Sequence, residues 1–115
     1  MLPVNETAIL KQITSYLALR GIFHWRANSG SRGKVSFNMT GCADIIGVRK
    51  LTLCEQRQCP RFTVGQFLAI EVKTATGKLS PAQESFRDQV ETQGGLYILA
   101  RSVADVEKAL GRRGK

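Results

Sequence analysis

The stretch QFLAIEVKT, residues Gln66–Thr74, decides the fold, because it is the longest strand-like segment of the chain. Side chains alternate between two faces along a strand, and one face is wholly apolar here: Leu68, Ile70 and Val72. Glu71 and Lys73 therefore lie next to each other on the opposite face. So apolar a strand is expected inside a sheet, where an unpaired charge is costly. The two charged groups must neutralise each other, reach solvent at the strand end, or hold an ion.

The run Asp44–Val48 is a second apolar, strand-like segment, and it begins with an acid. It is expected to lie beside the central strand, which brings Asp44 close to Glu71 and Lys73. Two carboxylates beside a lysine suit phosphodiester hydrolysis. The acids bind a divalent cation that polarises the phosphoryl group and acidifies a water, and the lysine orients that water or stabilises the developing charge. Each residue also has an ordinary explanation: an ion pair for Glu71 and Lys73, and a turn residue after Gly41 for Asp44.

Signals along the rest of the chain predict one α/β domain over residues 1–115, with a small mixed sheet flanked by helices. The expected elements are, in chain order, a helix over 5–20, strands over 22–26, 44–48 and 66–74, a helix between Ser80 and Gly94, a strand over 96–100, and a helix from Ser102 to Gly111. The last strand follows a crossover helix, so it is expected to run parallel to a neighbour. Residues 28–41 are expected to form a loop or irregular hairpin, and residues 49–65 an extended hairpin tip or an insertion.

Two helix starts carry polar residues that bear on the site. Ser80, Pro81 and Gln83 combine an N-cap hydroxyl, a proline at the first helical position and a glutamine that closes a capping box. Glu6 lies three residues before Ile9, on the stripe that should face the core, and a carboxylate on a buried face asks for a reason. Simpler explanations exist for both, since the capping box alone accounts for Gln83 and the helix dipole favours Glu6 in a first turn.

The charge balance points to a polyanionic partner. Seventeen Lys and Arg stand against nine Asp and Glu, giving a net charge of +8 and a pI near 9.9. Nucleic acid is the commonest such partner, although a ribosome-associated or membrane-surface protein would show the same balance. Arg32, Lys34 and Lys78 are the candidates for phosphate contacts, because they lie in loops expected to flank the site. Simple solvation explains them as well.

Other features of the chain restrict the function further. No apolar run approaches the roughly 18 residues of a membrane-spanning helix, and no secretory signal is seen, so a cytoplasmic protein is expected. The three cysteines, Cys42, Cys54 and Cys59, do not suggest disulfides or a zinc site. His24 is the only histidine, and a structural role is expected for it.

Three motifs together resemble a known nuclease pattern. An acid begins a strand in GCADII (residues 41–46), Glu-x-Lys follows on the next strand in AIEVKT (69–74), and a helix starts at LSPAQ (79–83). The chain resembles the PD-(D/E)xK nuclease superfamily and, more closely, its viral-type replication and repair nuclease domain, VRR-NUC. The likeness extends from Glu6 to the ending GGLYILARSVADV (94–106), which matters because Glu-x-Lys alone is common.

This resemblance implies a restriction-endonuclease-like αβββαβα core and metal-dependent hydrolysis. It implies that Asp44 and Glu71 bind Mg²⁺ or Mn²⁺, that the carbonyl of Val72 completes the metal site, and that Lys73 positions the attacking water. Ala43 replaces the proline that gives the superfamily its name. That position varies widely, so the replacement weakens the motif match more than the mechanism.

The resemblance also implies a role for two outer residues and a substrate. Glu6 would be a further acid near the metal, and Gln83 a polar group that steadies the lysine or a phosphate. The expected function is a structure-specific DNA endonuclease acting at branched DNA, such as Holliday junctions or flaps, in replication, recombination or repair. A homodimer is expected, because a two-fold pair places two active sites on two strands.

Two other functions stay open from the residues alone. The first is a catalytically silent nucleic-acid-binding accessory protein with the same fold, although such a protein has no physical cause to retain both acids and the lysine. The second is a restriction-type endonuclease with a defined recognition sequence. The chain is short for an additional DNA-reading domain, and it shows no candidate recognition helix.

Overall fold

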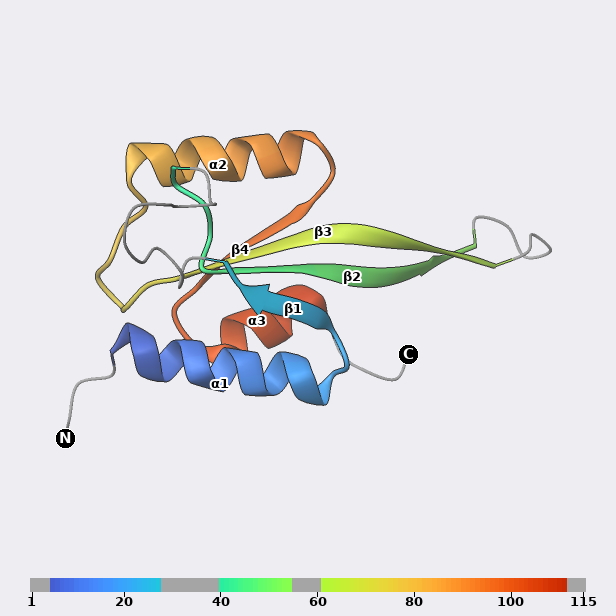
Figure 1. The fold of residues 1–115 in the computed structure, drawn as a ribbon, viewed down its shortest axis with the longest axis horizontal. Coiled ribbons are helices and arrows are strands. Elements are labelled where there is room, and N and C mark those ends of the chain that lie inside the picture. The colour runs from blue at the N-terminus through green and yellow to red at the C-terminus, as the bar shows by residue number, and fades with distance from the viewer. Residues whose placement is uncertain (1–4, 28–39, 55–60, 112–115) are drawn as a thin grey trace.

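The computed structural model describes residues 5–27, 40–54 and 61–111, and within them it contains three helices and one four-stranded sheet (Figure 1). In chain order the elements are α1 (Glu6–Leu19), β1 (Phe23–Arg26), β2 (Ile45–Leu53), β3 (Phe62–Val72), α2 (Pro81–Thr92), β4 (Leu96–Ala100) and α3 (Val103–Leu110). The predicted α/β class and the predicted order of elements are confirmed. The predicted loop over 28–41 lies mostly outside the described residues, which exclude 28–39.

The sheet has the strand order β1-β2-β3-β4. β2 pairs antiparallel with both β1 and β3, whereas β4 runs parallel to β3, as predicted from the crossover through α2. In this register Ile45 lies opposite Ile70, so the start of β2 meets the end of β3. The pairing of β3 with β4 continues one residue further, where Lys73 N donates to the carbonyl of Ala100 at 3.0 Å. The candidate acids and the lysine therefore gather at one end of the sheet.

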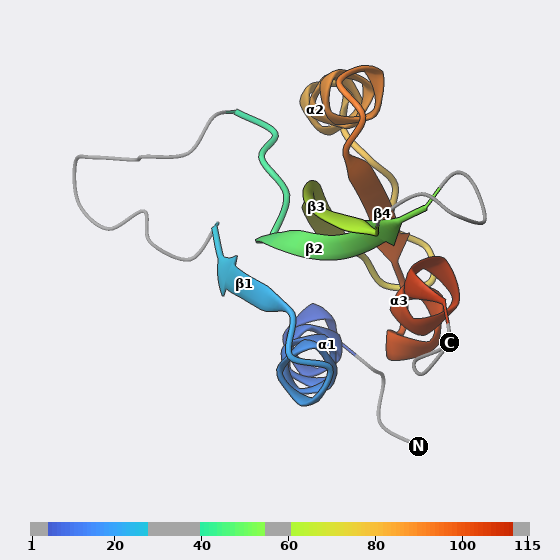
Figure 2. The same ribbon diagram turned by 90° about the vertical axis from the view of Figure 1, so that its right-hand side faces the viewer.

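The two faces of the sheet are covered by different helices, with α1 and α3 on one side and α2 on the other (Figures 1 and 2). Aliphatic side chains, most of them large, fill the first face: Ile9, Leu10, Ile13, Leu17, Ile45, Leu68, Ile70, Val72, Ile98, Ala100, Val106 and Leu110. Smaller groups and two aromatic rings fill the second: Ala27, Cys42, Ala43, Ile46, Ala69, Phe86, Val90 and Tyr97. The predicted alternation along β3 is confirmed, and it places Glu71 on the face that carries α2.

β2 and β3 extend well beyond the rest of the sheet as a two-stranded ribbon (Figure 1). The sequence prediction ended the first strand at Val48 and began the second at Gln66, so it was too short, since pairing continues to Leu53 and begins at Phe62. The physical reason is burial. The ribbon extends past the helices, most of its side chains are exposed, and polar residues such as Arg49 interrupt the apolar pattern that marks a core strand.

The helix ends agree with most of the predicted capping. The side chain of Asn5 accepts from Ala8 N at 2.8 Å, and the capping box of Ser80 is complete. Ser102 occupies the predicted N-cap of α3, but its hydroxyl makes no capping hydrogen bond. Asp105 in the first turn instead accepts at 2.8 Å from the main-chain N of Arg101, the residue before the N-cap, and so ties the helix start to the end of β4. Among the helices that the structure describes, none is long and apolar enough to span a bilayer.

Candidate active site

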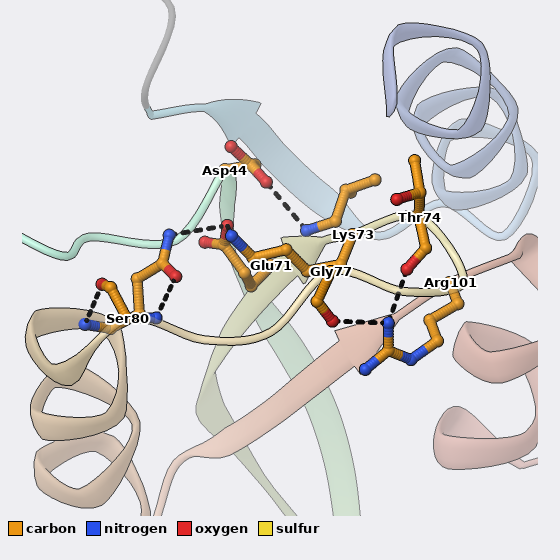
Figure 3. Close-up of polar contacts among 9 residues, drawn as sticks. Asp44, Glu71, Lys73, Thr74, Gly77, Ser80 and Arg101 are labelled. Carbon is orange, nitrogen blue, oxygen red and sulfur yellow. Dashed lines mark hydrogen bonds and ion pairs between the residues drawn. The ribbon is translucent and has the colours of Figure 1, made fainter. Parts of the chain in front are cut away.

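Asp44 is held at the start of β2 by hydrogen bonds to two other strands. Its main-chain carbonyl accepts from Ala27 N at 2.9 Å. Its side-chain Oδ2 accepts from Val72 N at 2.8 Å, which ties the carboxylate to the end of β3 (Figure 3). Because a main-chain donor fixes one oxygen, the carboxylate cannot swing away to solvent without leaving that donor unsatisfied. The structure thus brings Asp44 to the end of the central strand, as the sequence predicted.

Gly41 fixes how the chain reaches Asp44. Its backbone has φ +81°, and a Cβ added there would lie 2.3 Å from the carbonyl oxygen of Ala82 in the first turn of α2. No side chain fits so close to another backbone, so only glycine permits this contact. The segment that carries Asp44 is therefore packed directly against the start of the helix that carries Gln83.

Glu71 is the buried acid of the site, with 3% of its surface exposed. Its Oε2 accepts from Gln83 Nε2 at 3.0 Å and lies 3.7 Å from Lys73 Nζ. Its Oε1 is buried and has no hydrogen-bond partner among the described residues. A buried carboxylate oxygen without a partner carries a large desolvation cost, so this atom is poised to accept a proton or a cation.

The surroundings of Glu71 raise its pKa from 4.5 to about 7. Burial is the largest cause, and the negative charge of Asp44 adds to it, while Lys73 acts in the opposite direction. A hydrogen bond between the two carboxyl groups, which forms only when one of them is protonated, also raises the pKa of Glu71. Without an additional cation, Glu71 is therefore protonated in a large share of molecules near neutral pH. A bound divalent cation would reverse this preference by stabilising both carboxylates.

Lys73 follows β3 directly, and its ammonium group lies beside Glu71, while the loop over residues 74–79 packs against its aliphatic chain (Figure 3). Gly77 packs over its aliphatic chain, because a Cβ added at Gly77 would lie 3.2 Å from Lys73 Cδ. Arg101, the residue that follows β4, supports that loop, since its Nη1 donates to the carbonyls of Thr74 at 2.5 Å and Gly77 at 2.8 Å. The lysine is only 17% exposed, so its stem is confined while its charge stays at the site.

Gln83 joins α2 to the acidic pair. Its Oε1 accepts from Ser80 N at 2.8 Å and its main-chain N donates to Ser80 Oγ at 3.1 Å, which completes the capping box. Its side-chain Nε2 donates to Glu71 Oε2 at 3.0 Å. The predicted capping box is therefore confirmed, and the same side chain also contacts the acid Glu71, whereas the prediction was that it steadies the lysine or a phosphate.

With this geometry established, comparison with protein-family models matches residues 8–104 of the 115 to the VRR-NUC domain. The chain belongs to the VRR-NUC family. The match begins in α1 and ends in α3, so it contains Asp44, Glu71 and Lys73, and it implies a nuclease-like function. Comparisons with curated proteins and with solved structures found no match.

The outer residues suggested for this VRR-NUC site have mixed outcomes. Glu6 is exposed, so the prediction that it lies on a buried face was wrong. As the first residue of α1, it keeps its carboxylate solvated beside the helix N-terminus, which removes any desolvation cost. Its charge still contributes slightly to the raised pKa of Glu71. Lys78 is exposed in the segment between β3 and α2, whereas Arg32 and Lys34 lie outside the described residues.

Two residues of the VRR-NUC site were missed from sequence. Arg101 follows β4 immediately, and the ends of parallel neighbouring strands meet at one edge of a sheet, so its position beside Lys73 was available as a signal. Tyr97 lies on β4, buried on the α2 face, and its hydroxyl has no hydrogen-bond partner among the described residues. Burial and the charge of Glu71 both raise its pKa. In the sequence, a tyrosine inside an apolar strand cannot be distinguished from a tyrosine that only packs in the hydrophobic core.

The donor atoms at this site suit a hard divalent cation. Mg²⁺ and Mn²⁺ prefer oxygen ligands, which the carboxylates of Asp44 and Glu71 with the carbonyl of Val72 would supply. The unpartnered Oε1 of Glu71 is the observation that favours such an ion. No group of three or more His, Cys, Asp or Glu that could hold a metal occurs among the described residues. Water and phosphate oxygens would therefore complete the shell, as is usual for Mg²⁺.

Proposed function

We propose that this VRR-NUC domain is a metal-dependent DNA endonuclease that hydrolyses phosphodiester bonds with Mg²⁺ or Mn²⁺. The observation that supports it best is the unpartnered, buried oxygen of Glu71, which lies at a site shared with Asp44 and Lys73. A structural ion pair between Glu71 and Lys73 needs neither a second acid nor an unsatisfied oxygen. A site built to receive a cation needs both.

Each side chain has a definite part in this proposal. A cation held by Asp44, Glu71 and the Val72 carbonyl would polarise the phosphoryl group and acidify a bound water. Gln83 holds Oε2 of Glu71 and so leaves Oε1 as the atom presented to the site. Lys73 adds a positive charge next to the acids, where it orients the attacking water or stabilises charge that develops on the phosphate.

Cleavage of a labelled four-way junction tests this function. Replacement of Lys73 by alanine is expected to slow Mg²⁺-dependent cleavage by about a hundredfold, because one preorganised charge is lost from the reacting centre. Lys108→Ala is the matched control, because it removes the same charge from an exposed position on α3, on the other face of the sheet. EDTA is expected to abolish cleavage by the unaltered protein.

The same assay separates the rival function. Equal cleavage by the unaltered protein and by the Lys73→Ala variant would refute the assignment. Binding of the junction with no cleavage under any metal would favour a catalytically silent accessory protein instead.

The proposed substrate is branched DNA, such as Holliday junctions or flaps, and the proposed assembly is a homodimer. A net charge of +8 suits a partner in which phosphates of several arms converge. A two-fold dimer would place two active sites on two strands of a symmetric junction. Gel filtration at micromolar concentration tests the assembly, and elution as a strict monomer would remove the dimer while leaving the nuclease intact.

A further inference from the structure

An exposed apolar surface lies on the same face of the sheet as the candidate active site. It consists of four side chains that are 41–68% exposed: Phe23, Trp25, Val48 and Phe67. The register places Phe23 opposite Val48 and Val48 opposite Phe67, so these three form one row across β1, β2 and β3. The rings of Phe23 and Trp25 are in contact, with centroids 5.3 Å apart. We call these four residues the aromatic platform.

The aromatic platform adjoins the catalytic acids. Trp25 lies opposite Ile46, and Asp44 is two residues before Ile46 on the neighbouring strand. Diagonal neighbours of this kind have Cα atoms about 7–8 Å apart, within reach of a large ring. Successive nucleotides of an unpaired strand span a similar distance, so a strand whose phosphate lies at Asp44 can place an adjacent base over Trp25.

Positive charge borders the aromatic platform on its other side. Phe23 and Val48 line a hollow of about 620 Å³ together with Arg20 and Lys50. Within the described part of the chain, no acidic residue lines this hollow. Arg20 also donates to the Tyr16 hydroxyl and to the carbonyl of Gly111, which holds its guanidinium in place. Exposed rings beside cations are the combination that binds unpaired nucleic acid, since bases stack on the rings and phosphates pair with the cations.

We propose that the aromatic platform binds an unpaired DNA strand next to the scissile phosphate, with a base stacked on Trp25. The inference rests on the proposed nuclease function and specifies its substrate as DNA with an unpaired segment beside the cut. The rings of the platform are exposed, and a DNA base can stack on them without a hydrogen bond from a side chain. Arg20 and Lys50 in the neighbouring hollow would pair with the phosphates of the same strand.

A second copy of the chain fits this surface less well. In a two-fold interface the same patch meets itself, so Arg20 and Lys50 at its border would face their own symmetry copies. Each copy also carries a net charge of +8, and like charges held close together are destabilising. Nucleic acid has the opposite charge and stacks on the same rings. A homodimer of this protein is therefore expected to use another surface.

Trp25 is the only tryptophan of the chain, so its fluorescence reports directly on the aromatic platform. Binding is measured in EDTA, without cleavage, with a short single-stranded oligothymidylate and with a duplex of the same length. The single strand is expected to quench Trp25. Anisotropy of the labelled single strand is expected to show about tenfold weaker binding for Trp25→Ala and for Phe23→Ala, with affinity largely restored in Trp25→Phe.

Phe62→Ala is the matched control, because Phe62 is 50% exposed on the opposite face of the β2–β3 ribbon. It is expected to bind the single strand as the unaltered protein does, and melting temperatures verify that each variant is folded. Equal affinity of Trp25→Ala and unaltered protein would overturn the proposal, as would an equal loss for single strand and duplex. Dimers that dissociate on Trp25→Ala in sedimentation would assign the surface to a second copy. Because no metal is present, these results are independent of whether the protein cleaves DNA.

Discussion

Replacement of Glu71 by glutamine is expected to lower metal-dependent cleavage by about a thousandfold. Glutamine keeps the size of the side chain and an oxygen that can accept from Gln83, but it removes one of the two carboxylates of the candidate metal site. The loss combines a weaker hold on the cation with a less polarised phosphate. Single-turnover cleavage of the junction at saturating Mg²⁺ measures it, and activity within tenfold of the unaltered protein would remove Glu71 from the proposed mechanism.

The same substitution is expected to stabilise the metal-free protein. A stabilising effect would indicate that the carboxylate of Glu71 serves function, whereas a destabilising effect would indicate that it supports the fold. Glu71 has a pKa raised from 4.5 to about 7 in the folded protein, so the folded state binds the proton more tightly than the unfolded state. The free energy of unfolding therefore falls as pH rises from 4.5 to 7, and the full cost is present above pH 7. That cost is at most about 3 kcal/mol for a shift of this size.

Urea unfolding in EDTA checks this second effect. Below pH 4.5 the Glu71→Gln variant and the unaltered protein are expected to have similar stability, and above pH 7 the variant is expected to be the more stable. Mg²⁺ is expected to raise the stability of the unaltered protein above pH 7 and to do so much less in the variant. A variant that is less stable than the unaltered protein above pH 7 would show that the carboxylate of Glu71 supports the fold.

The sequence predicted most of the fold because its central strand and its helix starts carry strong local signals. The alternation in β3 indicates both the buried face and the position of Glu71, and the motif of Ser80 and Gln83 marks the start of α2 within one residue. The distal ribbon was predicted only as one of two alternatives, an extended hairpin tip, and its strands were predicted too short, because residues such as Lys50 and Thr63 are exposed and have no core to impose an apolar pattern. The strand ends there are set by pairing between β2 and β3, and the sequence pattern of one strand alone does not show how far this pairing extends.

The candidate site could be predicted in part, for a similar reason. Convergence of Asp44 and Glu71 follows from adjacent strands, so it could be inferred from the order of elements. The burial of Glu6 was inferred wrongly, since a stripe of apolar residues does not reveal where a helix extends past the core. The order of elements indicates that Arg101 lies beside Lys73, but its hydrogen bond to the carbonyl of Thr74, 27 residues away in sequence, leaves no trace in the side-chain pattern.

Replacement of Gly41 by alanine is expected to be the most damaging single change outside the acids and the lysine. Alanine must adopt φ +81° there, which costs about 1–2 kcal/mol, and its Cβ would also lie 2.3 Å from the carbonyl oxygen of Ala82. That contact can be relieved only by separating the start of α2 from the segment that leads to Asp44. The loss of stability is therefore expected to exceed the conformational cost by at least about 1–2 kcal/mol.

Gly21→Ala isolates the conformational part of that cost, because Gly21 has φ +72° and no atom beyond its immediate chain neighbours lies within 4 Å of an added Cβ. Urea unfolding is expected to show a clearly larger loss for Gly41→Ala than for Gly21→Ala. Cleavage at a temperature where both variants are folded is expected to fall only for Gly41→Ala, because the movement separates Asp44 from the Gln83–Glu71 pair. Equal effects of the two substitutions on stability and cleavage would mean that the contact between Gly41 and α2 does not hold the site together. The close approach of two backbones would then be a result of the fold and not a requirement for the chemistry.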